Sequence, residues 1–138
     1  MFKNLFDRKL KTDAFTSLIA HSTLINGTLN FSGIIKIQGV VEGDVIRSTT
    51  SDTEKCEDCI IVDESGKITS QEMSAQDIII AGKVFSKKIQ AEGTLRVLKN
   101  AEINNATIYY RTLEIEPGAL LNSCQLKHLD YCSEGEVT

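Results

Sequence analysis

The sequence predicts an all-β, single-domain parallel β-helix, a solenoid of about six coils with a triangular cross-section. Pairs of apolar residues separated by one residue recur along the chain, and their first members stand at positions 18, 35, 60, 78, 95 and 113. The spacings between them are 17, 25, 18, 17 and 18 residues. Repeats of this length are typical of solenoids, whose units are too small to bury an apolar face alone and therefore stack.

The alternation inside each pair has period two, which indicates a strand with one buried face. Parallel strands that return every 17 or 18 residues, with no helix between them, pair as coils of a β-helix. Residues that favour turns follow five of the pairs: Gly39, Ser65-Gly66, Gly82, Asn100 and Pro117-Gly118. We expect two columns of buried side chains along the rod: Leu18, Ile35, Ile60, Ile78, Leu95 and Leu113 in one, and Ala20, Ile37, Val62, Ile80, Val97 and Ile115 in the other.

Composition narrows the possible functions. The 138 residues carry a formal net charge of -4, which gives no general attraction to nucleic acid, so no nucleic-acid partner is expected. No apolar run reaches the roughly 18 residues of a spanning helix, and the N-terminus lacks the features of a signal peptide. We therefore expect a cytoplasmic location.

Residues 1–16 form an N-terminal tail outside the repeat. Four basic and two acidic side chains make this segment positive within an acidic protein. As a helix it would place Phe2, Leu5, Phe6 and Leu10 on one stripe, as in helices that lie on anionic membranes. The candidate membrane-targeting residues are Met1, Phe2, Lys3, Leu5 and Phe6. The alternative is a disordered chain end.

The repeat occupies residues 17–128, and the 25-residue step is explained by a polar loop at 46–58. The loop ends in a C-x-x-C of Cys56 and Cys59, which are weak metal candidates, because Cys124 and Cys132 are too widely spaced to complete a four-cysteine zinc site. Plain thiols are the expected state in the cytoplasm. Residues 129–138 are expected to be a short frayed or helical tail.

Little in the chain indicates catalysis, and no enzyme activity or cofactor is expected. The two histidines, His21 and His128, lie at opposite ends of the predicted rod. Left-handed hexapeptide acyltransferases also have an 18-residue coil, but their six-residue aliphatic rhythm is broken here at Arg47 and Thr107. Glu42 and Asp44 are expected to be solvated corner residues.

Two surface features suggest contacts with other molecules. Ile61 and Ile79 are expected side by side on adjacent coils and facing outward, as a lateral or partner contact or packed beneath the polar loop.

The first and last coils are as apolar as the middle ones, and the tails beyond them are polar. Uncapped ends with unpaired backbone groups are expected to join end to end into a filament. Its candidate residues are Leu24, Leu29, Phe31, Leu113, Ile115, Leu120 and Leu126. No phosphate-binding glycine loop is present, so this polymerisation should need no nucleotide. The alternative is a monomeric β-helix that binds partners through Ile61 and Ile79.

The chain resembles the bactofilins, a family of bacterial polymer-forming cytoskeletal proteins. The most specific part is IIKIQGVVEGDV at residues 34–45, with Gly39, Val41, Gly43 and Asp44; DIIIAGKV, TLEIEPGAL and MFKNLF are similar to other parts of the family pattern. The resemblance implies a right-handed β-helix and nucleotide-free filaments, often without polarity because like ends meet. It also implies attachment to the inner membrane surface and scaffolding of cell-wall-modifying or other membrane-associated proteins. The loop with its C-x-x-C and the short C-terminal tail depart from the pattern.

Overall fold

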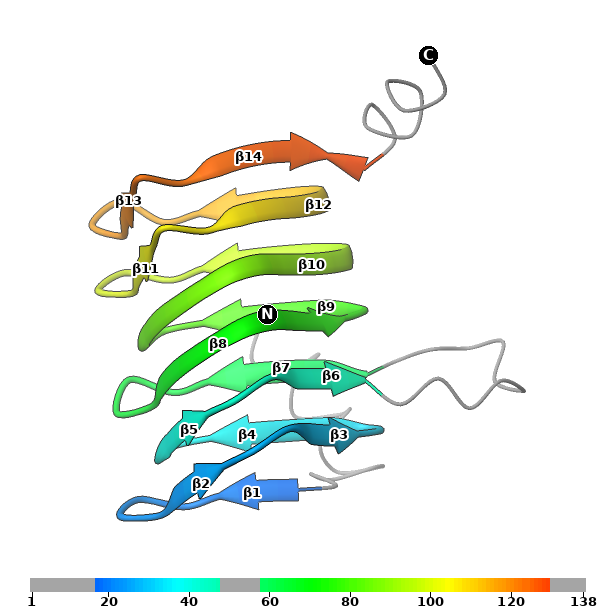
Figure 1. The fold of residues 1–138 in the computed structure, drawn as a ribbon. Helices are drawn as coiled ribbons and strands as arrows, with labels where there is room; N and C mark the ends of the chain where they lie inside the picture. Colours follow the sequence, from blue (N-terminus) through cyan, green and yellow to red (C-terminus); the bar gives the residue numbers. More distant parts are fainter. Residues whose placement is uncertain (1–16, 48–57, 130–138) are drawn as a thin grey trace, which may run out of the picture.

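The computed structural model describes residues 17–47 and 58–129, and the tails and most of the polar insertion lie outside this part of the chain. These residues form a stack of six coils, from β1 at one end to β14 at the other (Figure 1). Every strand pair is parallel. The described residues of the coils are 17–33, 34–47 with 58, 59–76, 77–93, 94–111 and 112–129, and we number them coil 1 to coil 6. The predicted all-β solenoid is confirmed.

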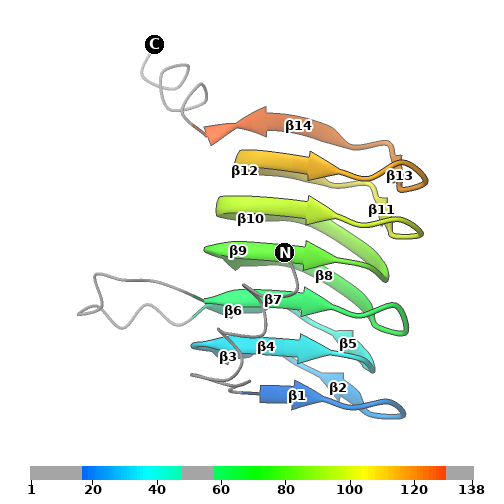
Figure 2. The ribbon, with the colours of Figure 1, turned by 180° about the vertical axis from the view of Figure 1, so that it is seen from behind.

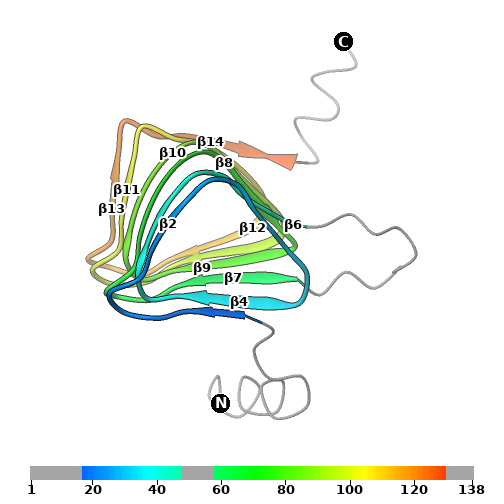
Figure 3. The ribbon, with the colours of Figure 1, turned by 60° about the horizontal axis from the view of Figure 1, so that its bottom comes forward.

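Each coil has three sides, so the stack is triangular in cross-section (Figure 3). Face A, which lies toward the viewer in Figure 2, contains β1 (Ser17–Ile19), β4 (Ile34–Ile37), β7 (Cys59–Val62), β9 (Asp77–Ile80) and the ends of β10 (Lys83–Val97) and β12 (Thr107–Ile115). Face B contains β2 (Leu24–Asn26), β5 (Val40–Glu42), β11 (Glu102–Asn104), β13 (Leu120–Asn122) and the first parts of β8 (Lys67–Ala75) and β10. Face C contains β3 (Leu29–Phe31), β6 (Val45–Arg47), β14 (Gln125–His128) and the remaining parts of β8, β10 and β12.

The corners between faces are tightly stacked. At the corner after face A, a Cβ added to Gly82 would lie 2.3 Å from the backbone oxygen of Asp63, and one added to Gly66 would lie 2.4 Å from that of Ile37. Glycine is therefore required where two such corners meet at this separation. Asp44 accepts hydrogen bonds from the backbone N–H groups of Gln71 (2.9 Å) and Glu72 (3.2 Å) on the next coil. It is therefore a structural corner residue, whereas we had expected only a solvated one.

The core is a set of continuous columns of inward-pointing side chains. On face A the strand register aligns Ile35, Ile60, Ile78, Leu95 and Leu113 in one column. A second column on this face contains Ile37, Val62, Ile80, Val97 and Ile115. Face B contributes Ile25, Val41, Ile68, Val84, Ile103 and Leu121, and face C contributes Leu29, Val45, Met73, Ile89, Ile108 and Leu126. Most of these side chains on coils 2 to 5 are completely buried.

The prediction for coil 1 was wrong by one residue. Ser17 pairs with Ile35 and Ile19 with Ile37, so Ile19 points inward and Leu18 faces outward beside Lys36. Leu18 and Ala20 do not occupy the two columns. In Ser-Leu-Ile-Ala either alternation is possible, and a shift of one residue moves every side chain to the other face. In the observed register Ile19 packs against the core cluster.

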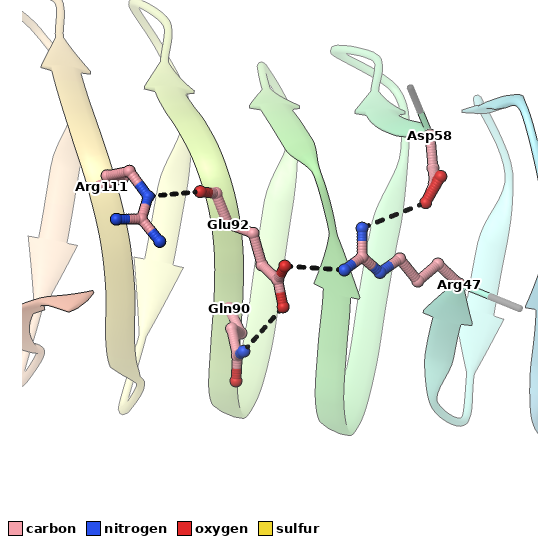
Figure 4. A network of polar contacts seen from close by, with 5 residues as sticks. All are labelled: Arg47, Asp58, Gln90, Glu92 and Arg111. Atoms are coloured by element: carbon pink, nitrogen blue, oxygen red, sulfur yellow. Dashed lines mark hydrogen bonds and ion pairs between the residues drawn. The ribbon is translucent and has the colours of Figure 1, made fainter. Parts of the chain in front are cut away.

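A polar network closes the insertion at its base (Figure 4). The prediction placed the loop at 46–58, but β6 continues through Arg47 and the described chain resumes at Asp58. Arg47 donates hydrogen bonds to Asp58 Oδ2 (3.3 Å) and to Glu92 Oε1 (2.7 Å) on coil 4. Gln90 donates to the other oxygen of Glu92, and Arg111 donates to the Glu92 backbone oxygen. The network therefore links coils 2, 4 and 5 at one corner.

The charge of Arg47 is maintained by this network. Burial lowers the pKa of the Arg47 guanidinium, but the charges and hydrogen bonds of Glu92 and Asp58 outweigh burial and raise its pKa above the ordinary value. Arg47 is therefore a permanent cation held between two carboxylates, one of which, Asp58, is buried.

Candidate functional site: the two terminal coils

The strands of the terminal coils have one neighbour each among the described residues. At the N-terminal end, β1, β2 and β3 pair only with β4, β5 and β6. At the C-terminal end, β13 pairs only with β11, and β14 only with β12. Each end therefore presents backbone N–H and C=O groups without a strand partner, which is the usual template for adding another strand.

The C-terminal end exposes core side chains. Ile115 continues the column of Ile80 and Val97, which are fully buried, yet 40% of its surface is exposed. Leu126 continues the column of Ile108 in the same way and is 45% exposed. Leu113 and Leu121 on this coil are half-buried. The inward columns thus end in an apolar surface that has no protein above it in the described part of the chain (Figure 1).

The N-terminal end has the same character with less exposed area. Ile19, Ile25 and Leu29 point inward on coil 1 and are half-buried. Phe31 lies in the core cluster and is almost fully buried. A second coil placed against either end would continue the inward columns and cover their last members.

Two of the predicted end residues point outward. Leu24 (58% exposed) and Leu120 (54% exposed) lie in the face B column that also contains Lys67 and Lys83. They belong to the terminal coils, as predicted, but point along the side of the rod. A coil stacked on the end would therefore cover them less than it covers Ile115 or Leu126.

The predicted lateral residues lie as neighbours on face A. Ile61 pairs with Ile79, and their outward column continues to Lys36 on one side and Arg96 on the other. Ile61 is only 9% exposed and Ile79 is half-buried. The pair is therefore adjacent and outward, but Ile61 is less accessible than its position on an outer face suggested.

The described residues keep the two histidines on the first and last coils and form no group that could hold a metal ion. His21 is exposed on coil 1, and His128 on coil 6 packs edge-on against Tyr110 on coil 5, with ring centroids 5.5 Å apart. No group of three or more histidine, cysteine or acidic side chains in residues 17–47 and 58–129 is arranged to hold a metal ion. Cys59 begins β7, and its predicted partner Cys56 lies outside the described residues.

The predicted membrane-targeting residues, Met1, Phe2, Lys3, Leu5 and Phe6, also lie outside the described part of the chain. Within that part, no helix has the length and apolarity to cross a lipid bilayer.

Sequence reasoning missed several residues that shape the ends. Ile19, Ile25 and Leu121 are inward end residues that were not among the candidates. Carrying the period-two count from one face through the corner to the next would have found Ile25 and Leu121. Sequence reasoning also missed the side-chain hydrogen bond from Asn122 to Asn104 (2.9 Å) on the outside of face B. The only sequence signal for this bond is that both residues are asparagine at the same position of adjacent coils.

Comparison with known proteins agrees with this geometry. The family model of bactofilins, described as polymer-forming cytoskeletal, matches residues 17–125. A crystal structure of a point mutant of Thermus thermophilus bactofilin is 22% identical, with a TM-score of 0.61 over 72% of this chain and 98% of that chain. A cryo-EM reconstruction of T. thermophilus bactofilin double helical filaments is 21% identical, with a TM-score of 0.65 over 80% of this chain and 98% of that chain.

No curated protein matches the chain. At these identities the two structures support the fold alone, while the family model covers 109 residues, counted from 17 to 125, which is more than half of the chain. The stack of parallel coils, the unpaired terminal strands and the family match together show that this chain belongs to the bactofilins, a family of polymer-forming cytoskeletal proteins.

Proposed function

We propose that the chain polymerises end to end, without nucleotide, into filaments at the cytoplasmic face of the inner membrane. There the filament organises cell-shape or cell-wall machinery, and its role is structural, with no catalysis. The filament axis is the coil axis, because the unpaired strands of coils 1 and 6 face along it.

The terminal coils are the observation that carries this proposal. Joining two ends would form on the order of ten backbone hydrogen bonds, each contributing about 0.5 to 1.5 kcal/mol net. It would also bury the apolar surface of Ile115 and Leu126, or that of the corresponding residues on coil 1. These gains increase the affinity of one end for another without any bound ligand.

Electron microscopy of purified Leu126→Lys protein tests the polymer. A lysine here places a charge in the junction, and we expect filaments to be lost while the chain remains folded, because Leu126 is already partly exposed in the single coil stack. Phe85→Lys is the matched control, since Phe85 is 36% exposed but faces outward on coil 4. Filaments from Leu126→Lys equal to those of the parent would exclude the C-terminal end as a junction.

The N-terminal end is tested separately by Ile25→Lys. Lysine on coil 1 places a charge among the half-buried end residues. If the filament alternates like ends, each single variant should stop at a dimer joined through the unaltered end. If unlike ends meet, both variants should remain monomers. Sedimentation velocity distinguishes the two, and full-length filaments from both variants would overturn axial polymerisation.

The membrane assignment rests on the apolar and basic residues of the N-terminal tail. Deletion of residues 2–8 is expected to abolish co-sedimentation with anionic vesicles and to leave filaments intact. Phe2→Ser with Phe6→Ser should reproduce the loss, and Asn4→Ser should not. Unchanged co-sedimentation after the deletion would remove the tail from membrane binding.

The cellular role is supported by the cytoskeletal description of the family. Cells that carry Leu126→Lys in place of the parent protein should lose localised filaments and show altered shape. Normal shape and unchanged placement of cell-wall enzymes in these cells would argue against this role.

A further inference from the structure

Two buried isoleucines lie outside the core. The structure buries 23 apolar residues among those it describes, and 21 of them pack in one cluster inside the coils. The other two are Ile34 (7% exposed) and Ile61 (9% exposed). Each is next to an inward residue of face A, Ile35 or Ile60, so the alternation of the strand turns it outward.

These residues form one apolar patch on face A. Ile34 pairs with Cys59, and Ile61 pairs with Ile79, so Ile34, Cys59, Ile61 and Ile79 lie on three adjacent coils. We call these four residues the face A patch. Lys36, Asp63, Asp77 and Arg96 lie at its edges. Phe85 also faces outward, on face B, and is 36% exposed.

The N-terminal segment begins beside this patch. Ser17 starts β1 on face A, and Leu18 stands in the same outward column as Ile61 and Ile79. Coils are about 4.8 Å apart, so Ile79 lies roughly 14 Å from Leu18 along the column. Residues 11–16 alone can span up to about 20 Å when extended, which is enough to return residues 2–10 over the patch.

Sequence distinguishes this segment from the other parts of the chain outside the described residues. Residues 1–16 contain Phe2, Leu5, Phe6 and Leu10, whose side chains match the apolar character of the patch. Residues 48–57 (STTSDTEKCE) and 130–138 (DYCSEGEVT) are polar and offer no comparable apolar set.

We propose that residues 2–10 dock through their apolar side chains on the face A patch of the same chain. Docking uses the same side chains as the proposed membrane binding, so a segment on the patch is unavailable to the membrane. The competition with the membrane depends on the proposed function, while docking itself does not.

The chain contains no tryptophan, so Phe6→Trp in the full-length protein provides a single reporter. Without vesicles we expect its emission at short wavelength and weak quenching by acrylamide. Adding Ile61→Glu should shift the emission to that of a water-exposed indole and increase quenching severalfold. The matched control, Phe85→Glu, should leave the emission unchanged. Circular dichroism checks that each variant is folded, and Ile79→Ser is a milder substitute if Ile61→Glu is not.

Concentration separates docking within one chain from coverage by a second copy. In a Leu126→Lys background the short-wavelength emission should be independent of protein concentration. A blue shift that grows with concentration would overturn the proposal in favour of contact between copies. Water-like emission in the parent reporter, or emission that neither Ile61→Glu nor Ile79→Ser changes, would overturn it too.

Vesicles test the competition. If the patch holds the segment away from the membrane, Ile61→Glu should strengthen binding of the reporter protein to anionic vesicles severalfold. Equal vesicle binding by the parent and Ile61→Glu would overturn competition. No vesicle binding by either protein would contradict the membrane assignment, while the emission in solution would still report docking.

Discussion

The interior and terminal coils have the same alternation of inward apolar residues, but these residues are buried in the interior coils and partly exposed in the last one. Ile80, Val97 and Ile115 occupy one column of face A, yet the first two are fully buried and the third is 40% exposed. The same contrast separates Ile108 from Leu126 on face C. What differs is the presence of a neighbouring coil on one side or on both. In this fold, burial depends on the next coil, and a molecule of the same kind can supply that coil.

The largest expected effect compares two isoleucines of one column. Ile80→Ala should lower the free energy of unfolding by about 2 to 5 kcal/mol, because it leaves a cavity between two coils. Ile115→Ala should cost roughly half of that or less, because part of its side chain already contacts water. Urea denaturation followed by circular dichroism, in a Leu126→Lys background that prevents polymerisation, measures both.

Polymerisation should reverse the importance of these two positions. When Leu126 is restored, Ile115→Ala is expected to raise the critical concentration for filaments, because Ile115 then lies in a junction. Equal unfolding costs at Ile80 and Ile115 in the monomer would show that coil 6 is already covered and would contradict the comparison.

A smaller effect distinguishes the buried ion pair at the corner from one on the surface. Arg47→Met should destabilise the chain by about 3 kcal/mol, because it leaves the buried Asp58 carboxylate without its guanidinium. Glu114→Gln removes the pair with Arg96 (2.9 Å) on face A, where Glu114 is mostly exposed, and should cost less than about 1 kcal/mol. Thermal unfolding of the two variants at the same pH compares them.

The double variant Arg47→Met, Asp58→Asn controls for the orphaned charge. It should recover part of the loss of Arg47→Met, since the unpaired carboxylate has been neutralised. No recovery would mean that Arg47 acts through Glu92, which connects the insertion to coil 4.

Much of this fold could be predicted from the sequence because its repeats are nearly uniform. Ile35, Ile60, Ile78, Leu95 and Leu113 align as expected, since each is one member of an alternating pair and each pair is followed by a corner. The pattern gave the wrong alternation in coil 1, where Leu18 and Ile19 are both suitable core residues. No local preference distinguishes them, and the register is set by pairing with Ile35 and Ile37.

The remaining features depend on distances between coils, which the alternating pattern does not contain. Arg47 was read as part of a polar loop, yet its guanidinium reaches Glu92, 45 residues away in the chain. Leu24 and Leu120 were placed at the ends because they are apolar and belong to the terminal coils. Their direction follows from the face B register, in which Leu24 pairs with Val40 and Leu120 pairs with Glu102.

The smallest expected effect compares two exposed leucines of coil 6 and shows whether filament assembly depends on the direction of a side chain or on its exposure. Leu120 is more accessible than Leu126, but it points outward from face B, so a charge there remains in water after another coil is added. Leu120→Lys should therefore retain filaments and change the critical concentration by less than about threefold, which corresponds to about 0.7 kcal/mol. Pelleting assays over a protein concentration series compare it with Leu126→Lys. Loss of filaments in both variants would mean that the junction extends over the side of the rod, and then exposure, whatever its direction, would determine assembly.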